Sequence, residues 1–391
     1  MFEKKLENFD QYRVFNDFRV VYCEKCGFLL NDTNYTQEEL NRFYTVESPY
    51  SAVSAHGAGG SSDIDTQVYE RYLSIVEPML SKKSRICDIG CAKGGFLNFL
   101  AKNGYENLYG VEISPKLVEI SRLSGLNVKI GSAEHIPLTT DKEKYDCLFF
   151  TNIFEHLFDL SKVLLSINNS LADNGYVFVE VPDCENYSNV EFYPYYHLLN
   201  PREHINHFSA YHLSLLMRGA GFNCVYMGQD VFKLNNSRYG SNPVLIMVFT
   251  RHLTPPPPPH AGKMHVGSCA THMNKYIAKS DIKIRDISAI IAQYNETRKP
   301  VYIWGISSDF FITATFTDLS KCNILGLIDK NVDKQHLSYK NMKILPLDAL
   351  KRINVDDTVF IFSVYNNDAM KKYLDDLTME CTVIDVTTVF K

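Results

Sequence analysis

Apolar and polar positions alternate along the chain in blocks that predict a series of strands and helices. Apolar residues at 68, 69, 72, 73, 76 and 80 follow the spacing of one helix face and predict a helix over 66–80. Short apolar runs predict strands at 85–89, 108–111, 128–130, 145–150, 176–181, 223–227 and 243–249. Helical segments at 96–102, 116–123, 160–171 and 211–218 separate several of these strands. Strands that alternate with helices predict a doubly wound α/β fold with a parallel sheet.

Polar residues mark the starts of three helices, of which the first has not been named above. Thr36 followed by Glu39 is a capping box, which predicts a helix over 38–44. Ser114 before Pro115 supplies an N-cap residue and a first-turn proline. Ser209 is the expected N-cap of the helix at 211–218.

Changes in composition divide the chain into four segments. Residues 1–65 contain Cys23 and Cys26 and end in a loop rich in Ser, Ala and Gly. Residues 66–251 carry the main α/β pattern. Residues 252–270 include five consecutive prolines, which favour an extended linker. Residues 271–391 repeat the pattern on a smaller scale, with strands expected at 301–305, 324–329 and 358–364, and indicate a second, smaller α/β domain.

Length and charge narrow the function classes. The 391 residues suit two or three domains, and 40 Lys and Arg against 45 Asp and Glu give a net charge of −5. Without a basic excess, a dedicated nucleic-acid binder is disfavoured. No apolar run reaches 18 residues and no apolar leader follows Met1, so we expect no membrane association and a cytoplasmic location. The ten cysteines are then expected to be reduced thiols.

One glycine-rich turn carries the candidate chemistry. It reads Asp88-Ile89-Gly90-Cys91-Ala92-Lys93-Gly94-Gly95, follows a predicted strand and opens a helix. Glycines let the backbone turn sharply and approach a ligand, and the helix N-terminus favours negative charge. The spacing differs from the G-x-G-x-x-G of dinucleotide-binding folds and suits a compact nucleoside. Glu112 ends the next strand, where a carboxylate can accept both hydroxyls of a ribose. Two strand-end acids in a nicotinamide-binding fold remain the alternative.

Residues 85–251 resemble the class I S-adenosylmethionine (SAM)-dependent methyltransferases. The resemblance rests on motifs in the family's order: the turn at 88–94, Val111-Glu112-Ile113-Ser114, 131–137, 145–150, Asn152-Ile153-Phe154-Glu155-His156 and 171–176. It implies that the turn, with Asp88, Gly90, Ala92 and Gly94, holds the methionine and ribose part of SAM. It also implies that Glu112 binds the ribose hydroxyls and Ile113 packs on the adenine, with Ser132, Ala133, Glu134 and Asn152 lining the rest of the site.

Two positions depart from the family pattern. Ala92 stands where the family usually has a glycine, and its single methyl group is expected to be tolerated. Ser132 stands where the family often has an acid that reads the adenine amine, so that contact is weaker or is made by backbone atoms.

The outer segments resemble those of the three-part sugar C-methyltransferases, which act on nucleotide-linked keto-deoxysugars. Trp304-Gly305-Ile306-Ser307-Ser308, 326–331 and 344–348 resemble that family's C-terminal Rossmann-like domain, and Glu203-His204 corresponds to its Glu-His pair. Methyl transfer to a carbon beside a ketone requires removal of a proton from that carbon. His204 is therefore the candidate general base, oriented by Glu203.

Other readings of these residues stay open. Glu203 and His204 belong to a stretch that can simply lead into the helix at Ser209, and His156, after the fourth strand, is a rival base. Cys23-x-x-Cys26 is half of a zinc knuckle. No Cys or His precedes it, so no metal site is assigned. Tyr44, Tyr50 and the following loop are candidates to close over the substrate.

The sequence therefore predicts a SAM-dependent methyltransferase that acts on a nucleotide-linked sugar or a related small molecule, with C-methylation slightly preferred. The alternatives are an O-methyltransferase acting on another small molecule, a nicotinamide-linked oxidoreductase, and a non-catalytic SAM-binding protein.

Overall fold

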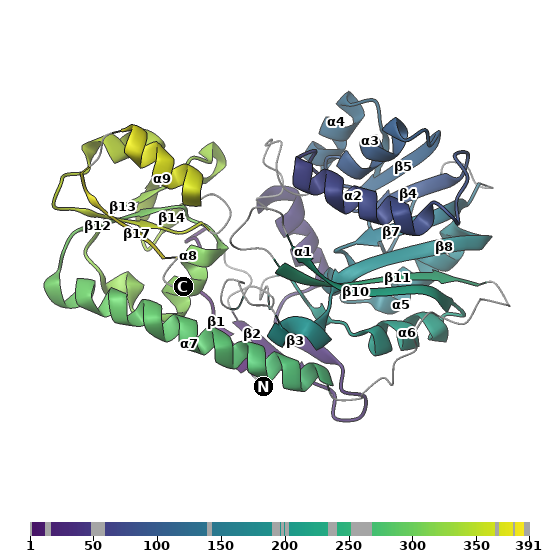
Figure 1. Ribbon diagram of the computed structural model, residues 1–391, viewed down its shortest axis with the longest axis horizontal. Helices are drawn as coiled ribbons and strands as arrows, with labels where there is room; N and C mark the ends of the chain where they lie inside the picture. Colours follow the sequence, from purple (N-terminus) through teal and green to yellow (C-terminus); the bar gives the residue numbers. More distant parts are fainter. Residues whose placement is uncertain are drawn as a thin grey trace.

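A computed structural model describes residues 2–11, 17–47, 59–138, 143–189, 196, 199, 203–233, 241–251, 268–363, 367–377 and 380–386. Figure 1 shows two lobes, with the long helix α7 (Ser268–Thr297) running along the molecule from one toward the other. Tyr50, the loop around it and the proline run lie outside the described residues.

The larger lobe is built on a seven-stranded sheet in the order β10-β11-β8-β7-β4-β5-β6. The strands are β4 (Arg85–Ile89), β5 (Asn107–Glu112), β6 (Asn127–Ile130), β7 (Tyr145–Thr151), β8 (Leu171–Pro182), β10 (Asn223–Lys233) and β11 (Ser241–Thr250). The predicted α/β architecture is confirmed, with one correction. β11 runs antiparallel to both of its neighbours, β8 and β10, so the sheet is mixed rather than wholly parallel. Only residues 234–240 join β10 and β11, which is too short for a parallel crossover.

Helices cover both faces of this sheet (Figure 1). The pleat of β7 sends Phe149 to the face that holds α2 (Asp63–Val76) and α3 (Gly95–Lys102), and Phe150 to the face that holds α5 (Leu160–Ser170) and α6 (Ala210–Gly219). α4 (Pro115–Leu123) follows β5. The predicted helix over 66–80 begins earlier, because Ser62 and Asp65 form a capping box, and it ends at Val76.

The smaller lobe has a six-stranded sheet in the order β14-β15-β13-β12-β16-β17, as expected for a second α/β unit. Its elements are β12 (Val301–Trp304), α8 (Ser308–Phe316), β13 (Ile324–Ile328), β14 (Ser338–Tyr339), β15 (Met342–Leu345), β16 (Thr358–Ile361), α9 (Asn367–Asp376) and β17 (Thr382–Asp385). All neighbouring strands are parallel except β14 and β15.

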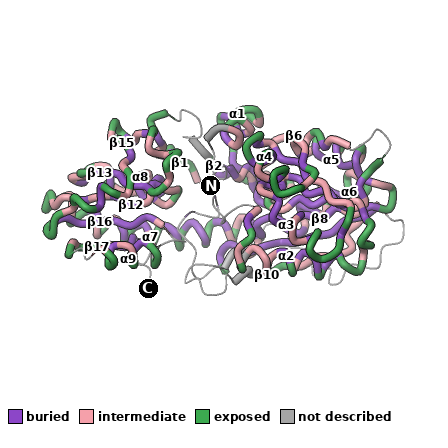
Figure 2. Tube along the Cα trace, turned by 90° about the horizontal axis from the view of Figure 1, so that it is seen from above, coloured by how far each residue is buried: buried purple, intermediate pink, exposed green. Residues whose placement is uncertain are grey.

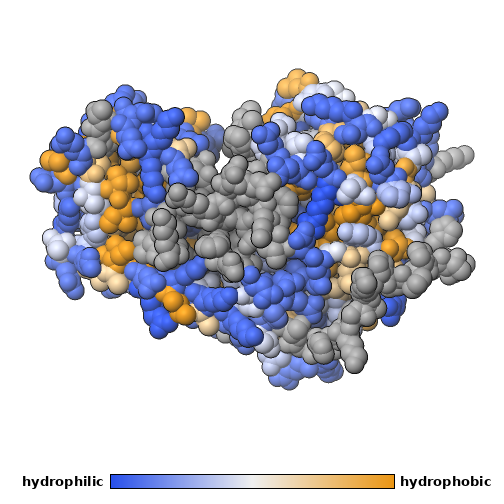
Figure 3. Space-filling view, viewed as in Figure 1, coloured by the Kyte–Doolittle hydropathy of each residue, from blue (hydrophilic) through white to orange (hydrophobic). Residues whose placement is uncertain are grey.

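Helix α7 was not predicted from the sequence, and it begins inside the expected linker. Met273, Ile277, Ile284, Ile287 and Ile291 are buried at helical spacing and pack into a core shared with the smaller lobe. The face of α7 turned to the viewer in Figure 3 is mainly hydrophilic, as the amphipathic pattern requires. Figure 2 shows the corresponding separation of buried from exposed positions along both lobes.

A small antiparallel sheet connects the N-terminal segment to the larger lobe. Its order is β1 (Phe2–Lys5), β2 (Asp17–Tyr22), β3 (Leu29–Thr33) and β9 (Asn206–His207). The last strand comes from the segment that follows β8, and Leu29 pairs with His207. After β3 the predicted capping box of Thr36 and Glu39 is confirmed, and it opens α1 (Gln37–Arg42), which continues as a π-helical turn at Phe43–Glu47.

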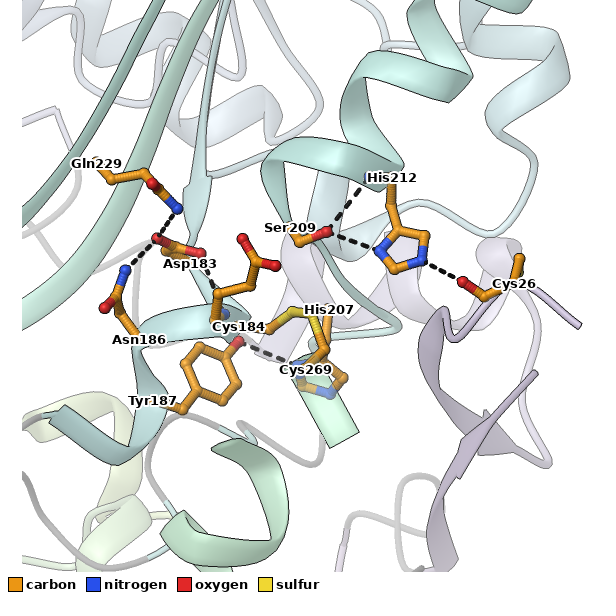
Figure 4. The surroundings of a disulfide bond; sticks show 11 residues. Cys26, Asp183, Cys184, Asn186, Tyr187, His207, Ser209, His212, Gln229 and Cys269 are labelled. Atoms are coloured by element: carbon orange, nitrogen blue, oxygen red, sulfur yellow. Dashed lines mark hydrogen bonds between the residues drawn. A yellow bond between two sulfur atoms is a disulfide. The ribbon is translucent and has the colours of Figure 1, made fainter. Parts of the chain in front are cut away.

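A disulfide joins Cys184, at the start of the 3₁₀ turn Cys184–Asn189, to Cys269 in the first turn of α7 (Figure 4). The expectation that all cysteines are reduced thiols is therefore wrong for this pair, which lies 85 residues apart in the sequence. The other eight cysteines are free thiols. Among the described residues, no helix has the length and apolar character needed to cross a membrane.

Candidate active site

A cavity of about 550 Å³ opens at the carboxyl ends of β4, β5 and β7. This edge is where open α/β sheets bind ligands. Nine of the ten residues predicted to bind the cofactor line the cavity: Asp88, Gly90, Ala92, Glu112, Ile113, Ser132, Ala133, Glu134 and Asn152. Gly94, the tenth, is the N-cap of α3 and is not among the lining residues. Nearly all of the residues named from the sequence therefore line one cavity, although they come from several different elements.

The glycine-rich turn requires left-handed backbone at three positions, with φ of +75° at Gly90, +47° at Ala92 and +77° at Gly94. A Cβ on Gly90 would lie 2.3 Å from Ile153 Cδ1, so a side chain there would be both strained and crowded. Gly95 is packed against backbone, since its Cβ would lie 2.0 Å from the Gly60 carbonyl oxygen. Ala92 is an L-residue in a conformation that glycine adopts without strain, which is a local cost of this departure from the family pattern.

Glu112 connects the turn to the end of β5. Its carboxylate accepts hydrogen bonds from the backbone N–H groups of Ala92 (2.9 Å) and Ser114 (2.8 Å). The side chain is buried, and burial raises the pKa of Glu112 while these hydrogen bonds oppose the shift. The two bonds fix the orientation of the carboxylate at the cavity wall.

Asp88 lies beside Glu112 at the floor of the cavity and is 4% exposed. Its Oδ1 atom is buried and has no hydrogen-bond partner among the described residues. Burial, together with the nearby Glu112 charge, raises the pKa of Asp88 to about 7. An acid in this state gains most from a ligand that brings a positive charge or a hydrogen-bond donor.

Two cavity residues on neighbouring elements were not identified from the sequence. The hydroxyl of Tyr72 in α2 donates to Glu180 Oε1 in β8 (2.8 Å), and the amide of Asn152 donates to the same atom (3.3 Å). Asn152 has φ of +54°, and its backbone N–H donates to the Glu180 carbonyl. A sequence signal for Glu180 was nevertheless present: it is an acidic residue within an apolar strand, and burying a carboxylate without a role is costly.

The predicted catalytic pair is divided between the cavity wall and the layer behind it. Glu203 lines the cavity, and its carboxylate accepts a hydrogen bond from the hydroxyl of Tyr44 (3.1 Å). His156, the rival base, also lines the cavity. His204 is not among the lining residues, and its ring lies edge-on to His156 with centroids 5.0 Å apart.

The ring of His156 is held in place by Glu203 and Tyr44, which also line the cavity. Its Nδ1 atom lies 2.9 Å from the Glu203 carbonyl oxygen and 3.0 Å from the Tyr44 hydroxyl. Because a carbonyl oxygen can only accept, this geometry assigns the proton to Nδ1, which donates to the Glu203 carbonyl, and leaves Nε2 as the acceptor. Burial lowers the pKa of His156 to about 4, so the ring is neutral near pH 7.

The thiols of Cys23 and Cys26 lie far along the chain from these groups, in a turn before β3, and both are partly exposed. Hydrogen bonds from the backbone of Cys26 and Lys25 lower the pKa of Cys23. Within the described ranges, no Cys, His, Asp or Glu joins the pair to form a three-ligand group.

Comparison with known proteins assigns this lobe to a class. Residues 64–227 match the family model described as a methyltransferase domain. The sequence matches no curated relative. The larger lobe therefore carries a methyltransferase domain on its seven-stranded sheet, and the predicted class of enzyme is confirmed at that level.

Solved structures of SAM-dependent methyltransferases are similar to part of the chain. The Thermotoga maritima protein is 22% identical, with 48% of this chain and 91% of that chain covered and a TM-score of 0.37. The Anabaena variabilis protein is 15% identical, with coverage of 49% and 86% and a TM-score of 0.40. The Archaeoglobus fulgidus protein is 18% identical, with coverage of 47% and 94% and a TM-score of 0.37.

Proposed function

We propose that the protein transfers the methyl group of SAM to a small molecule, a nucleotide-linked keto-deoxysugar, at the carbon beside the ketone. The observation that carries this proposal is the position of Glu203 and Tyr44 in the same cavity as the glycine-rich turn. A carboxylate with a hydroxyl donor beside the methyl donor is what proton removal from an acidic C–H group needs. The resemblance to the sugar C-methyltransferases supplies the acceptor class.

The residues around the turn fit SAM. Glu112 would accept the ribose hydroxyls, Ile113 would pack against the adenine, and Asp88 would receive the methionine amino group at its unpartnered oxygen. SAM supplies a methyl group on a positively charged sulfur, so the leaving group needs no activation. The protein's task is to align the acceptor atom with that methyl group and to exclude water.

At the acceptor end, Glu203 would remove the proton and Tyr44 would orient its carboxylate. We retain the prediction that His204 takes part in the same step. It stands behind Glu203 and His156, so its contribution is testable separately from theirs. The segments 1–65 and 271–391 would hold the nucleotide part of the acceptor, with 66–251 holding SAM.

The test uses the full chain with SAM and nucleotide-linked keto-deoxysugars, and it measures S-adenosylhomocysteine release. In deuterated water, with S-adenosylhomocysteine in place of SAM, C-methylation requires exchange of the proton beside the ketone. Turnover without this exchange would favour the O-methylation alternative, in which the same base takes a hydroxyl proton.

Variants assign the roles. Glu203→Gln should abolish both exchange and turnover while leaving the thermal stabilisation by SAM intact. Tyr44→Phe should reduce both by about tenfold to a hundredfold. Glu119→Gln, on the exposed side of α4, is the matched control. Undiminished exchange by Glu203→Gln, together with its loss in His204→Gln, would transfer the role of the base to His204.

A further inference from the structure

At the edge of the cavity three side chains converge on one point, and one of them, His156, lines the cavity itself. Glu155, His156 and His204 each place a ligand atom within 4.8 Å of the others, and Nε2 of His156 lies 3.8 Å from Glu155 Oε1. Glu155 and His156 are in the 3₁₀ turn Phe154–His156 after β7, whereas His204 precedes β9. The fold therefore assembles this cluster from segments almost fifty residues apart.

The structure pairs the Glu155 carboxylate with no charged cation among the described residues, since the nearby His156 ring is neutral near pH 7. The residue is 1% exposed, and neither carboxylate oxygen has a hydrogen-bond partner among the described residues. Burial raises the pKa of Glu155 well above its ordinary value, its own backbone N–H opposes this shift, and the charges of Glu180 and Glu203 raise the pKa further. An isolated buried carboxylate of this kind is strongly unfavourable unless it is neutralised or coordinates a cation.

The orientation of His156 provides an independent observation. Its Nδ1–H donates to the Glu203 carbonyl, which leaves the Nε2 lone pair on the side of Glu155. Metal-ligating histidines commonly have this arrangement, in which one ring nitrogen donates to a backbone carbonyl and the other binds the ion. Two imidazoles and one carboxylate form a ligand set used by zinc enzymes and by non-haem iron enzymes.

We propose that Glu155, His156 and His204 bind a divalent first-row transition-metal ion, with Zn²⁺ as its simplest representative. Bonds of about 2.1 Å in a tetrahedron place ligand atoms about 3.4 Å apart. The present separations therefore require the side chains to close inward by about an ångström or less at each ligand. Three protein ligands leave a further coordination position, and His156 connects the ion to the cavity.

The ion would act on the acceptor, and this role rests on the proposed function, whereas binding of the ion does not. It would coordinate the ketone oxygen and stabilise the negative charge that forms there when Glu203 takes the adjacent proton. The carbon then forms a bond to the methyl group, the methyl–sulfur bond breaks, and its electron pair stays on sulfur to give S-adenosylhomocysteine.

Binding is tested on the chelator-treated full chain without acceptor. Co²⁺ should bind in a 1:1 ratio and give visible bands of nitrogen and oxygen coordination, and Zn²⁺ should displace it in calorimetry. Glu155→Gln and His204→Gln should each weaken binding by about a hundredfold or more. Both variants should retain thermal stabilisation by SAM, which shows that they are folded. His336→Gln, an exposed histidine in the smaller lobe, is the matched control.

A double variant, Cys23→Ser with Cys26→Ser, separates this site from the knuckle-like turn. If the ion binds at the proposed cluster, the double variant keeps the cobalt bands, and they lack thiolate charge transfer. Loss of the ion in the double variant would overturn the proposal, and so would failure of Co²⁺ and Zn²⁺ to bind the wild type at micromolar concentration. A wild type that binds the ion but methylates no keto-sugar would contradict the proposed acceptor and leave the metal site intact.

Discussion

Protonation of Asp88 should control the affinity for SAM. Its pKa of about 7, against an unfolded value of 3.8, means that the folded protein holds a proton that the unfolded chain has lost. Folded-state stability from this group is therefore present at low pH and falls as pH rises from about 4 to 7. The difference of about three pKa units corresponds to about 4 kcal/mol. Binding of the SAM amino group to Asp88 requires the ionised form, so binding should expel this proton.

The expected size of the effect follows from that pKa. At pH 6 about 0.9 proton should be released per SAM bound, and at pH 8 about 0.1, so affinity should rise about tenfold between these values. Calorimetry in two buffers of different ionisation enthalpy measures both quantities. Asp88→Asn is the control, because titration of SAM's own groups is the same with either protein. Equal proton release by the wild type and Asp88→Asn at pH 6 would refute the reasoning.

Three other predictions concern the turn, the disulfide and the segment before β9. Ala92→Gly should raise the free energy of unfolding in urea by up to about 1 kcal/mol, because glycine adopts φ of +47° without strain; a decrease would contradict this account. Reduction of the Cys184–Cys269 bond should cost about 4–5 kcal/mol in the chain-entropy picture, given 85 residues of separation. Melting with and without reductant measures this, and Cys184→Ser should not respond to reductant. Asn31→Ala removes an amide that donates to the partly buried His204 carbonyl and should cost about 1–3 kcal/mol. Turnover should then fall while the thermal shift with SAM persists, and unchanged turnover would show that Asn31 does not position this segment.

The cofactor end of the cavity was predictable from sequence because its residues lie close together along the chain. The turn at 88–95 and Glu112 follow two adjacent parallel strands, and such strands bring their carboxyl ends to one edge. The residues next to each strand end were therefore enough to predict which side chains meet at this edge of the sheet. The strand at 85–89 coincides with β4 for the same reason: a short apolar run between polar turns has one register in a central strand.

The acceptor end was less predictable because its geometry depends on pairing between distant segments. Glu203 and His204 were identified as chemistry-bearing residues, but β9 pairs with β3, about 175 residues earlier in the chain. A strand of two residues is too short to leave a recognisable pattern in the sequence. Helix α7 was missed for a different reason. Its apolar residues do follow helical spacing. The prolines before it led us to end the expected linker at residue 270, which lies inside the helix, and no helix was predicted after it.

The small N-terminal sheet therefore contacts the proposed acceptor site. Asn31 of β3 donates to the His204 carbonyl through its side chain and to the Ile205 carbonyl through its backbone, while Tyr44 reaches the Glu203 carboxylate. Leu6 and Phe9 of the same segment pack into the core of α7 and the smaller lobe. One segment therefore contacts both the backbone at 204–205 and the smaller lobe, whereas the glycine-rich turn belongs to a separate sheet. In the proposed function, cofactor binding is thus built into one sheet, whereas the acceptor chemistry at Glu203 draws on contacts from all three parts of the chain.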